Sequence, residues 1–280
     1  MLEHTFCHLP RIGAATEEKL WASGCLTWDD AMNGAAEAVL GTRAAWARQA
    51  LAESAERLAA GDADWFAERL PSHQQWRLLG AFRHALAYVD IETTGLAMDE
   101  DHITTLAYYD GDSVRTYVHG RDLEDFRDHV PAAKVLVTFN GKCFDAPFIE
   151  RRMGIRLPRA HVDLRFVLKK LGLSGGLKRC EKLLGLDREE MDGVDGFFAV
   201  VLWRHWENTG DPAALETLLA YNALDVVNLE PLAAHAYNEL AARMPVSPEP
   251  WPKPACPAPV PHTPDLALVA RLKASMAPRF

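Results

Sequence analysis

Two carboxylates lie two positions apart in one short apolar segment of this chain. Asp90 and Glu92 belong to LAYVDIE, residues 86–92. Because side chains alternate across a β-strand, both carboxylates would lie on the same face of a strand. Two carboxylates so close raise each other's pKa unless a cation lies between them. The pair therefore predicts a cation site at the end of a buried strand. The alternative is an acidic strand end exposed to water.

A third acid stands at the expected start of a helix. In TFNGKCFDAPFIERRM, residues 138–153, a strand is expected to end at Phe139 and a helix to begin near Lys142. Asp145 would lie in the first turn of that helix, where the helix dipole favours an anion. Taken alone, Asp145 is at least as consistent with stabilising the helix start as with binding a metal.

The fourth acid lies in LLAYNALDVVNLEPL, residues 218–232. Tyr221 and Asp225 are four positions apart and therefore share one face of a helix. An aspartate in the middle of an apolar helix is unfavourable for both helix propensity and burial. By itself, such a pair would more often form a structural hydrogen bond.

The four acids are more informative together than singly. Asp90, Glu92, Asp145 and Asp225 offer the oxygen ligands that two Mg²⁺ or Mn²⁺ ions prefer. Two such ions about 4 Å apart stabilise both the attacking and the leaving oxygen of a phosphodiester displacement. The chemistry that these residues predict is metal-dependent cleavage of nucleic acid.

The elements that must position these acids form an α/β pattern. Four strands are predicted, at about 86–92, 102–109, 113–118 and 134–139. Asp110-Gly111-Asp112 between the second and third strands indicates a hairpin. Helices are expected at about 122–129, 143–153, 163–171, 176–184, 195–208 and 212–242. Three antiparallel strands followed by alternating strands and helices favour a mixed sheet covered by helices.

Two further regions flank this pattern. Residues 1–75 are alanine-rich and predict a small helical region ahead of a domain that spans residues 76–243. Nine prolines between positions 245 and 264 predict that residues 244–280 form an extended linker and a tail. Apolar residues recur at helical spacing in that tail, at Leu266, Val269 and Leu272. Disorder is the favoured interpretation, and a short helix that docks on a protein partner is the alternative.

Charge and cysteine content indicate which ligands and which cellular compartment to expect. The formal net charge is −9, yet ten basic and two acidic residues lie between Arg151 and Lys182. That segment is either a phosphate-binding wall or a pair of solvated helices. The five cysteines form no C-x-x-C pair, which indicates a reducing compartment. With no signal peptide and no apolar run of about 20 residues, the cytoplasm is expected and a membrane location is not.

Three segments resemble the motifs of the DEDD exonucleases, which share the ribonuclease-H-like fold. They are VDIETTGL (89–96), FNGKCFD (139–145) and YNALD (221–225). HVDLRF (161–166) and GGLKRCEKLLGL (175–186) are similar to the YprB-like branch of this superfamily. The resemblance covers roughly residues 76–240. It implies a two-metal 3′→5′ exonuclease acting on the 3′ ends of single-stranded DNA or RNA.

The resemblance also implies a role for each acid. Asp90 would bridge both metal ions, Glu92 and Asp225 would hold the ion on the nucleophile side, and Asp145 would hold the other, partly through water. A tyrosine four positions before the last aspartate is typical of one subgroup, in which Tyr221 would position or deprotonate the attacking water.

Other site residues follow from the same resemblance. Thr93, Leu96 and Asn140 would contact or stack on the terminal nucleotide. Lys178 would either reach a phosphate or face solvent near a helix start. His161 belongs to the resemblance, and a structural role is the favoured interpretation for it.

The N-terminal segment HLPRIGAATEEKLWASGCLTWDDAM, residues 8–32, resembles a helix-hairpin-helix. In that motif, backbone N–H groups at a helix N-terminus bind a phosphate. Arg11 stands where the first glycine of the hairpin is usual. The alternative is a purely structural helical cap with a small core, formed by Leu20, Trp21, Cys25 and Trp28.

Two other functions fit the same residues. One is a nucleic-acid-binding or partner-binding module with little catalysis. The presence of all four acids argues against it, because a binding module gains nothing from carboxylates that repel one another. The other is a ribonuclease-H-like endonuclease, since one arrangement at a strand end can serve either kind of cut.

Overall fold

A five-stranded mixed sheet forms the centre of the molecule. The computed structural model describes residues 1–186, 194–252 and 258–276. The strands are β1 (Leu86–Thr93), β2 (Ile103–Tyr109), β3 (Val114–Val118), β4 (Val135–Thr138) and β5 (His161–Asp163), in the order β3-β2-β1-β4-β5. β1 pairs antiparallel with β2 and parallel with β4. β2 pairs antiparallel with β3, and β4 parallel with β5. The predicted α/β class and mixed sheet are confirmed.

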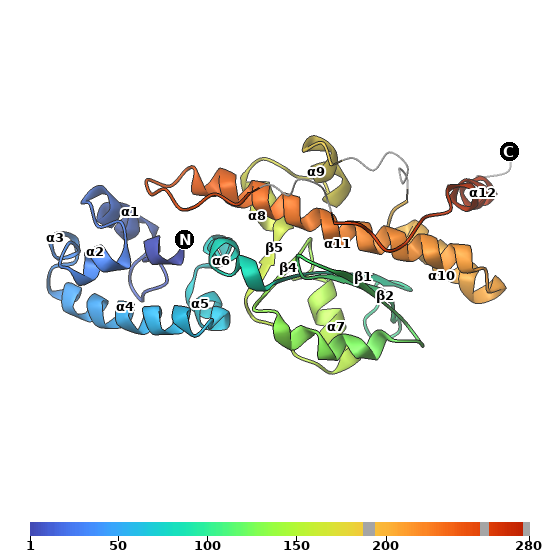
Figure 1. The fold of residues 1–280 in the computed structure, drawn as a ribbon, viewed down its shortest axis with the longest axis horizontal. Helices are drawn as coiled ribbons and strands as arrows, with labels where there is room; N and C mark the ends of the chain where they lie inside the picture. Colours follow the sequence, from blue (N-terminus) through green and yellow to red (C-terminus); the bar gives the residue numbers. More distant parts are fainter. Residues whose placement is uncertain (187–193, 253–257, 277–280) are drawn as a thin grey trace.

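Helices cover both faces of this sheet. They are α7 (Asp145–Met153), α8 (Leu164–Lys170), α9 (Leu177–Leu183), α10 (Gly196–Thr209) and α11 (Pro212–Ala241). Figure 1 shows α11 running across one face of the sheet and α7 lying against the other. None of the helices in the described ranges combines the length and the apolar composition that crossing a bilayer requires.

The predicted boundaries agree closely with these elements. Both ends of each predicted strand lie within one residue of the observed ends. Both ends of the five predicted helices from residue 143 onward lie within two residues of the observed ends. The turn at Asp110 is also as predicted, since its carboxylate accepts hydrogen bonds from the backbone of Asp112 and Ser113. The expected helix at about 122–129 is a 3₁₀ helix, Leu123–Asp128. β5 was not predicted, because three residues are too few to display an alternating pattern.

The N-terminal region is helical, as expected. Its helices are α1 (Ala14–Ala22), α2 (Trp28–Met32), α3 (Glu37–Leu40), α4 (Ala44–Ala59) and α5 (Ala63–Arg69), and α6 (Arg77–Ala81) follows at the start of the predicted domain 76–243. Short 3₁₀ helices join elements here and at the sheet, over Leu2–His4, Gly41–Arg43, Ser72–Gln74, Arg83–Ala85 and Val130–Ala132. The predicted core residues Leu20, Trp21, Cys25 and Trp28 are buried. They belong to one apolar cluster that continues into the sheet.

A buried ion pair fixes the N-terminal segment against α6. Both guanidinium nitrogens of Arg77 lie 2.8 Å from the carboxylate oxygens of Glu17, and the two side chains are 3% and 2% exposed. The backbone N–H groups of Phe6 and Cys7 donate to the same carboxylate at 2.6 and 3.0 Å. One carboxylate therefore holds the chain start, α1 and α6 in a single arrangement.

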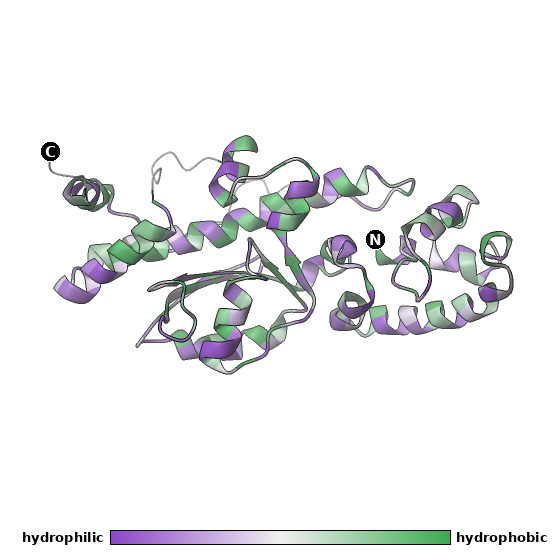
Figure 2. Cartoon of the chain, turned by 180° about the vertical axis from the view of Figure 1, so that it is seen from behind, coloured by the Kyte–Doolittle hydropathy of each residue, from purple (hydrophilic) through white to green (hydrophobic). Residues whose placement is uncertain are grey.

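The C-terminal tail docks on the rest of this chain. Residues 258–264 lie outside helices and strands, and α12 (Leu266–Met276) buries Leu268 and Val269 in a cluster with α10 and α11. Figure 2 shows the apolar colouring along α10, against which the tail helix lies. The favoured expectation of a disordered tail is therefore wrong for residues 266–276. The tail forms a helix because its apolar residues pack on α10 and α11 of the same chain.

The Glu17–Arg77 pair generates a prediction about stability. Arg77→Met should lower the free energy of unfolding by about 3–5 kcal/mol, because it leaves a buried carboxylate without its cation. Adding Glu17→Gln to that variant should recover part of the loss, since the amide oxygen still accepts the two backbone hydrogen bonds. Urea unfolding followed by circular dichroism measures both. A loss below about 1 kcal/mol would mean that the pair does not anchor the segment.

Candidate metal centre

Alternation along β1 places Asp90 and Glu92 on the side of the sheet that α11 covers. Leu86 and Tyr88 precede them on this face and pack in the same apolar cluster as residues of α11. Ala87, Val89 and Ile91 face the other way, into a cluster with Phe148 and Ile149 of α7. The acids thus continue a buried apolar row, and their carboxylates lie between β1 and α11.

Three elements bring four acids to this point. Carboxylate oxygens of Asp90, Glu92 and Asp225 all lie within 4.8 Å of one another. Asp145, the first residue of α7, accepts a hydrogen bond from the backbone N–H of Ile91 at 3.1 Å. That N–H is available because β4 pairs with β1 only as far as Tyr88. The ends of β1 and β4 therefore leave room for the start of α7 beside the other three acids.

Burial and mutual repulsion make this cluster unfavourable for anions on their own. Burial, followed by the charges of Asp145, Asp225 and Glu92, raises the pKa of Asp90 well above its ordinary range. Burial also raises the pKa of Glu92, with Asp225 and Asp145 as the next causes. The pKa of Asp145 rises to about 7, mainly through burial. The donor set is entirely oxygen, which fits a hard divalent cation such as Mg²⁺ or Mn²⁺.

Asn222 is a site residue that sequence reasoning missed. Its side-chain N–H₂ group donates to the carboxylate of Asp90 at 2.7 Å and to the Asp90 carbonyl at 3.3 Å. Asn222 is fully buried and precedes Asp225 by three positions, so it shares a helix face with it. An asparagine inside an apolar helix was the available signal. It keeps Asp90 oriented and lowers the cost of its negative charge.

Tyr221 and Lys178 lie next to each other at the cluster. The ring of Tyr221 is buried, and the ammonium of Lys178 lies 4.4 Å from the ring centroid. Lys178 is half-buried, and its charge opposes the rise in the pKa of Glu92. Glu181 of α9 accepts a hydrogen bond from Asn228 of α11 at 2.9 Å, which fixes the helix that carries Lys178. Lys178 therefore contacts α11 at Tyr221, on the helix face that also carries Asp225.

The residues expected at the terminal nucleotide differ in their surroundings. The hydroxyl of Thr93 is buried and donates to the Gly95 carbonyl at 2.6 Å. Leu96, three residues after the end of the strand, is 81% exposed. Asn140 adopts a left-handed backbone conformation with φ of 70° and accepts a hydrogen bond from Arg165. Thr93 and Asn140 thus shape turns, whereas Leu96 presents an apolar side chain to solvent.

His161 is a structural residue, as favoured. Its Nε2 lies 2.8 Å from the hydroxyl of Thr138, and burial lowers its pKa to about 3, so the ring stays neutral. Asp163, two residues later, accepts hydrogen bonds from the backbone N–H groups of Asn140, Lys142 and Arg165. It thereby caps α8 and holds the turn that leads to Asp145.

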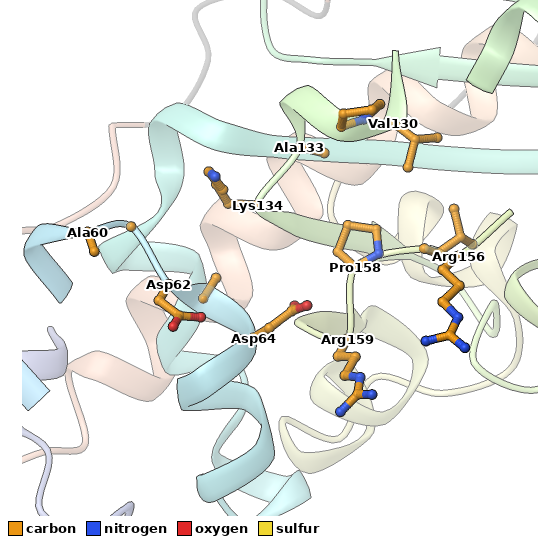
Figure 3. A pocket seen from close by; sticks show the side chains of 13 residues that line it. Ala60, Asp62, Asp64, Val130, Ala133, Lys134, Arg156, Pro158 and Arg159 are labelled. Atoms are coloured by element: carbon orange, nitrogen blue, oxygen red, sulfur yellow. The ribbon is translucent and has the colours of Figure 1, made fainter. Parts of the chain in front are cut away.

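A separate hollow of about 710 Å³ lies at the opposite end of the sheet (Figure 3). Lys134, which precedes β4, and Arg156 and Arg159, which precede β5, contribute to its lining. The parallel strands begin there, whereas Asp90 and Glu92 stand near the carboxyl end of β1. This hollow is therefore not part of the acidic site.

The raised pKa values predict how pH acts on the metal-free protein. The folded state binds a proton at Asp145 more tightly than the unfolded chain, with a pKa of about 7 against 3.8. Stability should therefore be highest near pH 4 and fall as pH rises to about 7, and added Mn²⁺ should restore it. Thermal unfolding in chelator, at several pH values, measures this. Asp145→Asn should flatten the profile, and Asp112→Asn, at an exposed acid, should not.

Comparison with known proteins gives a family, a curated relative and similarity to solved structures. The model of the RNase_H superfamily matches residues 87–237. The uncharacterized protein YprB of Bacillus subtilis (strain 168) is 27% identical over 184 residues, which cover 58% of this chain and 44% of that protein. This chain thus spans less than half the length of that relative.

Among solved structures, the family B DNA polymerase of the hyperthermophilic archaeon Pyrobaculum calidifontis is similar with a TM-score of 0.43 and 18% identity. The match covers 55% of this chain and 25% of the polymerase. The family match extends over more than half of the residues and includes the mixed sheet, α7 and most of α11. The chain belongs to the RNase H superfamily.

Proposed function

We propose that this protein is a two-metal-dependent 3′→5′ exonuclease that hydrolyses phosphodiester bonds of single-stranded DNA or RNA. The observation that carries the proposal is the meeting of Asp90, Glu92, Asp145 and Asp225 from three elements at one strand end. Carboxylates gathered in this way need a cation for compensation, and a phosphodiester offers the matching negative charge.

Each acid has a place in this proposal. Asp90 would bridge two Mg²⁺ or Mn²⁺ ions, Glu92 and Asp225 would hold the ion on the nucleophile side, and Asp145 would hold the other. When bound, the two ions would lower the pKa of a water and neutralise charge on the phosphate. Asn222 keeps the carboxylate of Asp90 in place through its hydrogen bond.

Tyr221 and Lys178 would act on the reacting groups from α11 and α9. A phenol is a weak base at neutral pH, so the hydroxyl of Tyr221 would orient the attacking water by hydrogen bonding. Lys178 lies against the Tyr221 ring, from where its ammonium would donate to a phosphate oxygen. These two residues would supply alignment and charge next to the acids.

The residues after β1 and β4 would hold the end of the strand. Leu96 is exposed and follows Glu92 by four residues, so it would pack against the terminal base. Thr93 and Asn140 would shape the surface around the terminal sugar through the turns that they form. Substrate entry from this side would present the last phosphodiester to the acids.

The direct test uses short single strands labelled at either end. We expect stepwise shortening from the 3′ end in Mg²⁺ or Mn²⁺, and loss of activity in chelator. Asp90→Asn should slow cleavage by about 10³-fold or more, equivalent to about 4 kcal/mol of transition-state stabilisation. The matched control is Asp112→Asn, which changes an exposed acid in the β2–β3 turn.

Three results would contradict the proposal. Cleavage that is indifferent to chelator or to Asp90→Asn would exclude the four acids as the catalytic centre. Cleavage of circular single strands would indicate an endonuclease, and tight binding of strands without any cleavage would indicate a binding module.

Tyr221→Phe tests the proposed role of the Tyr221 hydroxyl separately from the role of the acids. It should lower kcat by roughly 10²-fold through loss of the hydroxyl that orients the water. Because the phenyl ring still packs in the same cluster, calorimetric affinity for Mn²⁺ should stay the same. Unchanged kcat would remove Tyr221 from the mechanism.

A further inference from the structure

A second hollow lies where α8 meets the segment that joins α5 to α6. Its volume is about 420 Å³. Its lining includes Phe166, Val167, Trp76, Lys142 and Lys170. The lining thus combines apolar and aromatic side chains with two cations.

This hollow lies at the same end of the sheet as the acids. Lys142 follows β4, and Phe166 stands in α8, which follows β5 directly. β1, β4 and β5 are parallel neighbours, so their carboxyl ends share one edge. Two strand spacings separate β1 from β5, roughly 10 Å. A nucleic-acid strand with its 3′ end at the acids would therefore pass this hollow within a few nucleotides.

Neither lysine forms an ion pair with an acid in the described ranges, although the charge of Asp163 opposes the fall in the pKa of Lys142. The ammonium of Lys142 donates to the amide oxygen of Gln75 at 2.6 Å, and that of Lys170 donates to the carbonyl of His73. Asp163 also lines the hollow, but its carboxylate accepts three backbone N–H groups. Desolvation lowers the pKa of Lys142, a cost that a bound anion would offset.

Two arginines of the basic segment, Arg151–Lys182, form ion pairs with acids instead. Arg151 forms an ion pair with Asp99, and Arg159 forms one with Glu68. The segment is therefore not a uniform phosphate-binding wall. Lys170 of this segment and Lys142, which precedes it, lie next to the hollow and form no ion pair with an acid in the described ranges.

Phe166 offers an apolar surface beside these cations. Its side chain is 47% exposed, whereas Trp76 and Val167 behind it are buried. A planar base stacks favourably on an exposed aromatic ring, and this contact tolerates any base sequence. An aromatic ring next to two ammonium groups matches one nucleotide, with its base on the ring and its phosphate on the lysines.

We propose that this hollow is a subsite for an upstream nucleotide of the substrate strand. The base stacks on Phe166, and the phosphate accepts hydrogen bonds from Lys142 and Lys170. The subsite rests on the proposed exonuclease function, because its occupant is the same strand whose end reaches the acids. It favours single strands, whose bases are free to stack.

Binding measured without cleavage tests the subsite. In the Asp90→Asn background, the affinity for single-stranded DNA and RNA of about eight nucleotides is compared with that for a dinucleotide. Phe166→Ala should weaken binding of the longer strand about tenfold and affect the dinucleotide less, and Phe166→Trp should restore it. Lys142→Gln with Lys170→Gln should reduce the salt dependence of log K by about 0.7 per lost phosphate contact.

The matched controls are Lys169→Gln, an exposed lysine next to Lys170 that does not line the hollow, and Phe197→Ala, an exposed aromatic on α10. Both should bind like the parent. Parent-like binding by Phe166→Ala and by the double lysine variant would overturn the subsite. If the wild-type protein still shortens strands in that case, the subsite fails alone. If it neither binds nor cleaves them, both proposals fail.

Discussion

The repulsion among four carboxylates gathered at the end of β1 is the constraint around which this molecule is organised. Burial and neighbouring charge raise the pKa values of Asp90, Glu92 and Asp145, so the folded chain carries an unfavourable cluster. Hydrogen bonds from Asn222 and from the backbone of Ile91, together with the charge of Lys178, offset part of this cost. The remaining cost is what divalent cations would relieve, and it must be balanced by packing elsewhere.

Much of that packing comes from α11. This helix carries Asn222 and Asp225, lies across β1 and its neighbours, and contacts α6, α8 and α9. The apolar cluster beneath it continues into the N-terminal helices, which the Glu17–Arg77 pair fastens to α6. The helical region is thus joined to α6, which contacts α11, and Trp76 at the start of α6 lines the hollow beside α8.

Local patterns were sufficient for most of the elements and for the acids. Alternation in residues 86–92 and the four-residue spacing of Tyr221 and Asp225 depend only on strand and helix periods. They failed where an element is too short, as in β5, or where the partner surface lies elsewhere in the chain, as for the tail helix. The tail is ordered because Leu268 and Val269 find α10, a contact that no local pattern encodes.

The sequence by itself determined the class of fold and which acids to expect near the end of β1, because residue type and periodicity are local properties. Tertiary structure decided which groups meet. It brought Asp145 to the backbone of Ile91, and Asn222 to Asp90 across 132 positions. It also separated cations paired with acids, such as Arg151, from those left beside the hollow, such as Lys142. Those outcomes depend on the packing of distant segments, which spacing along the chain does not express.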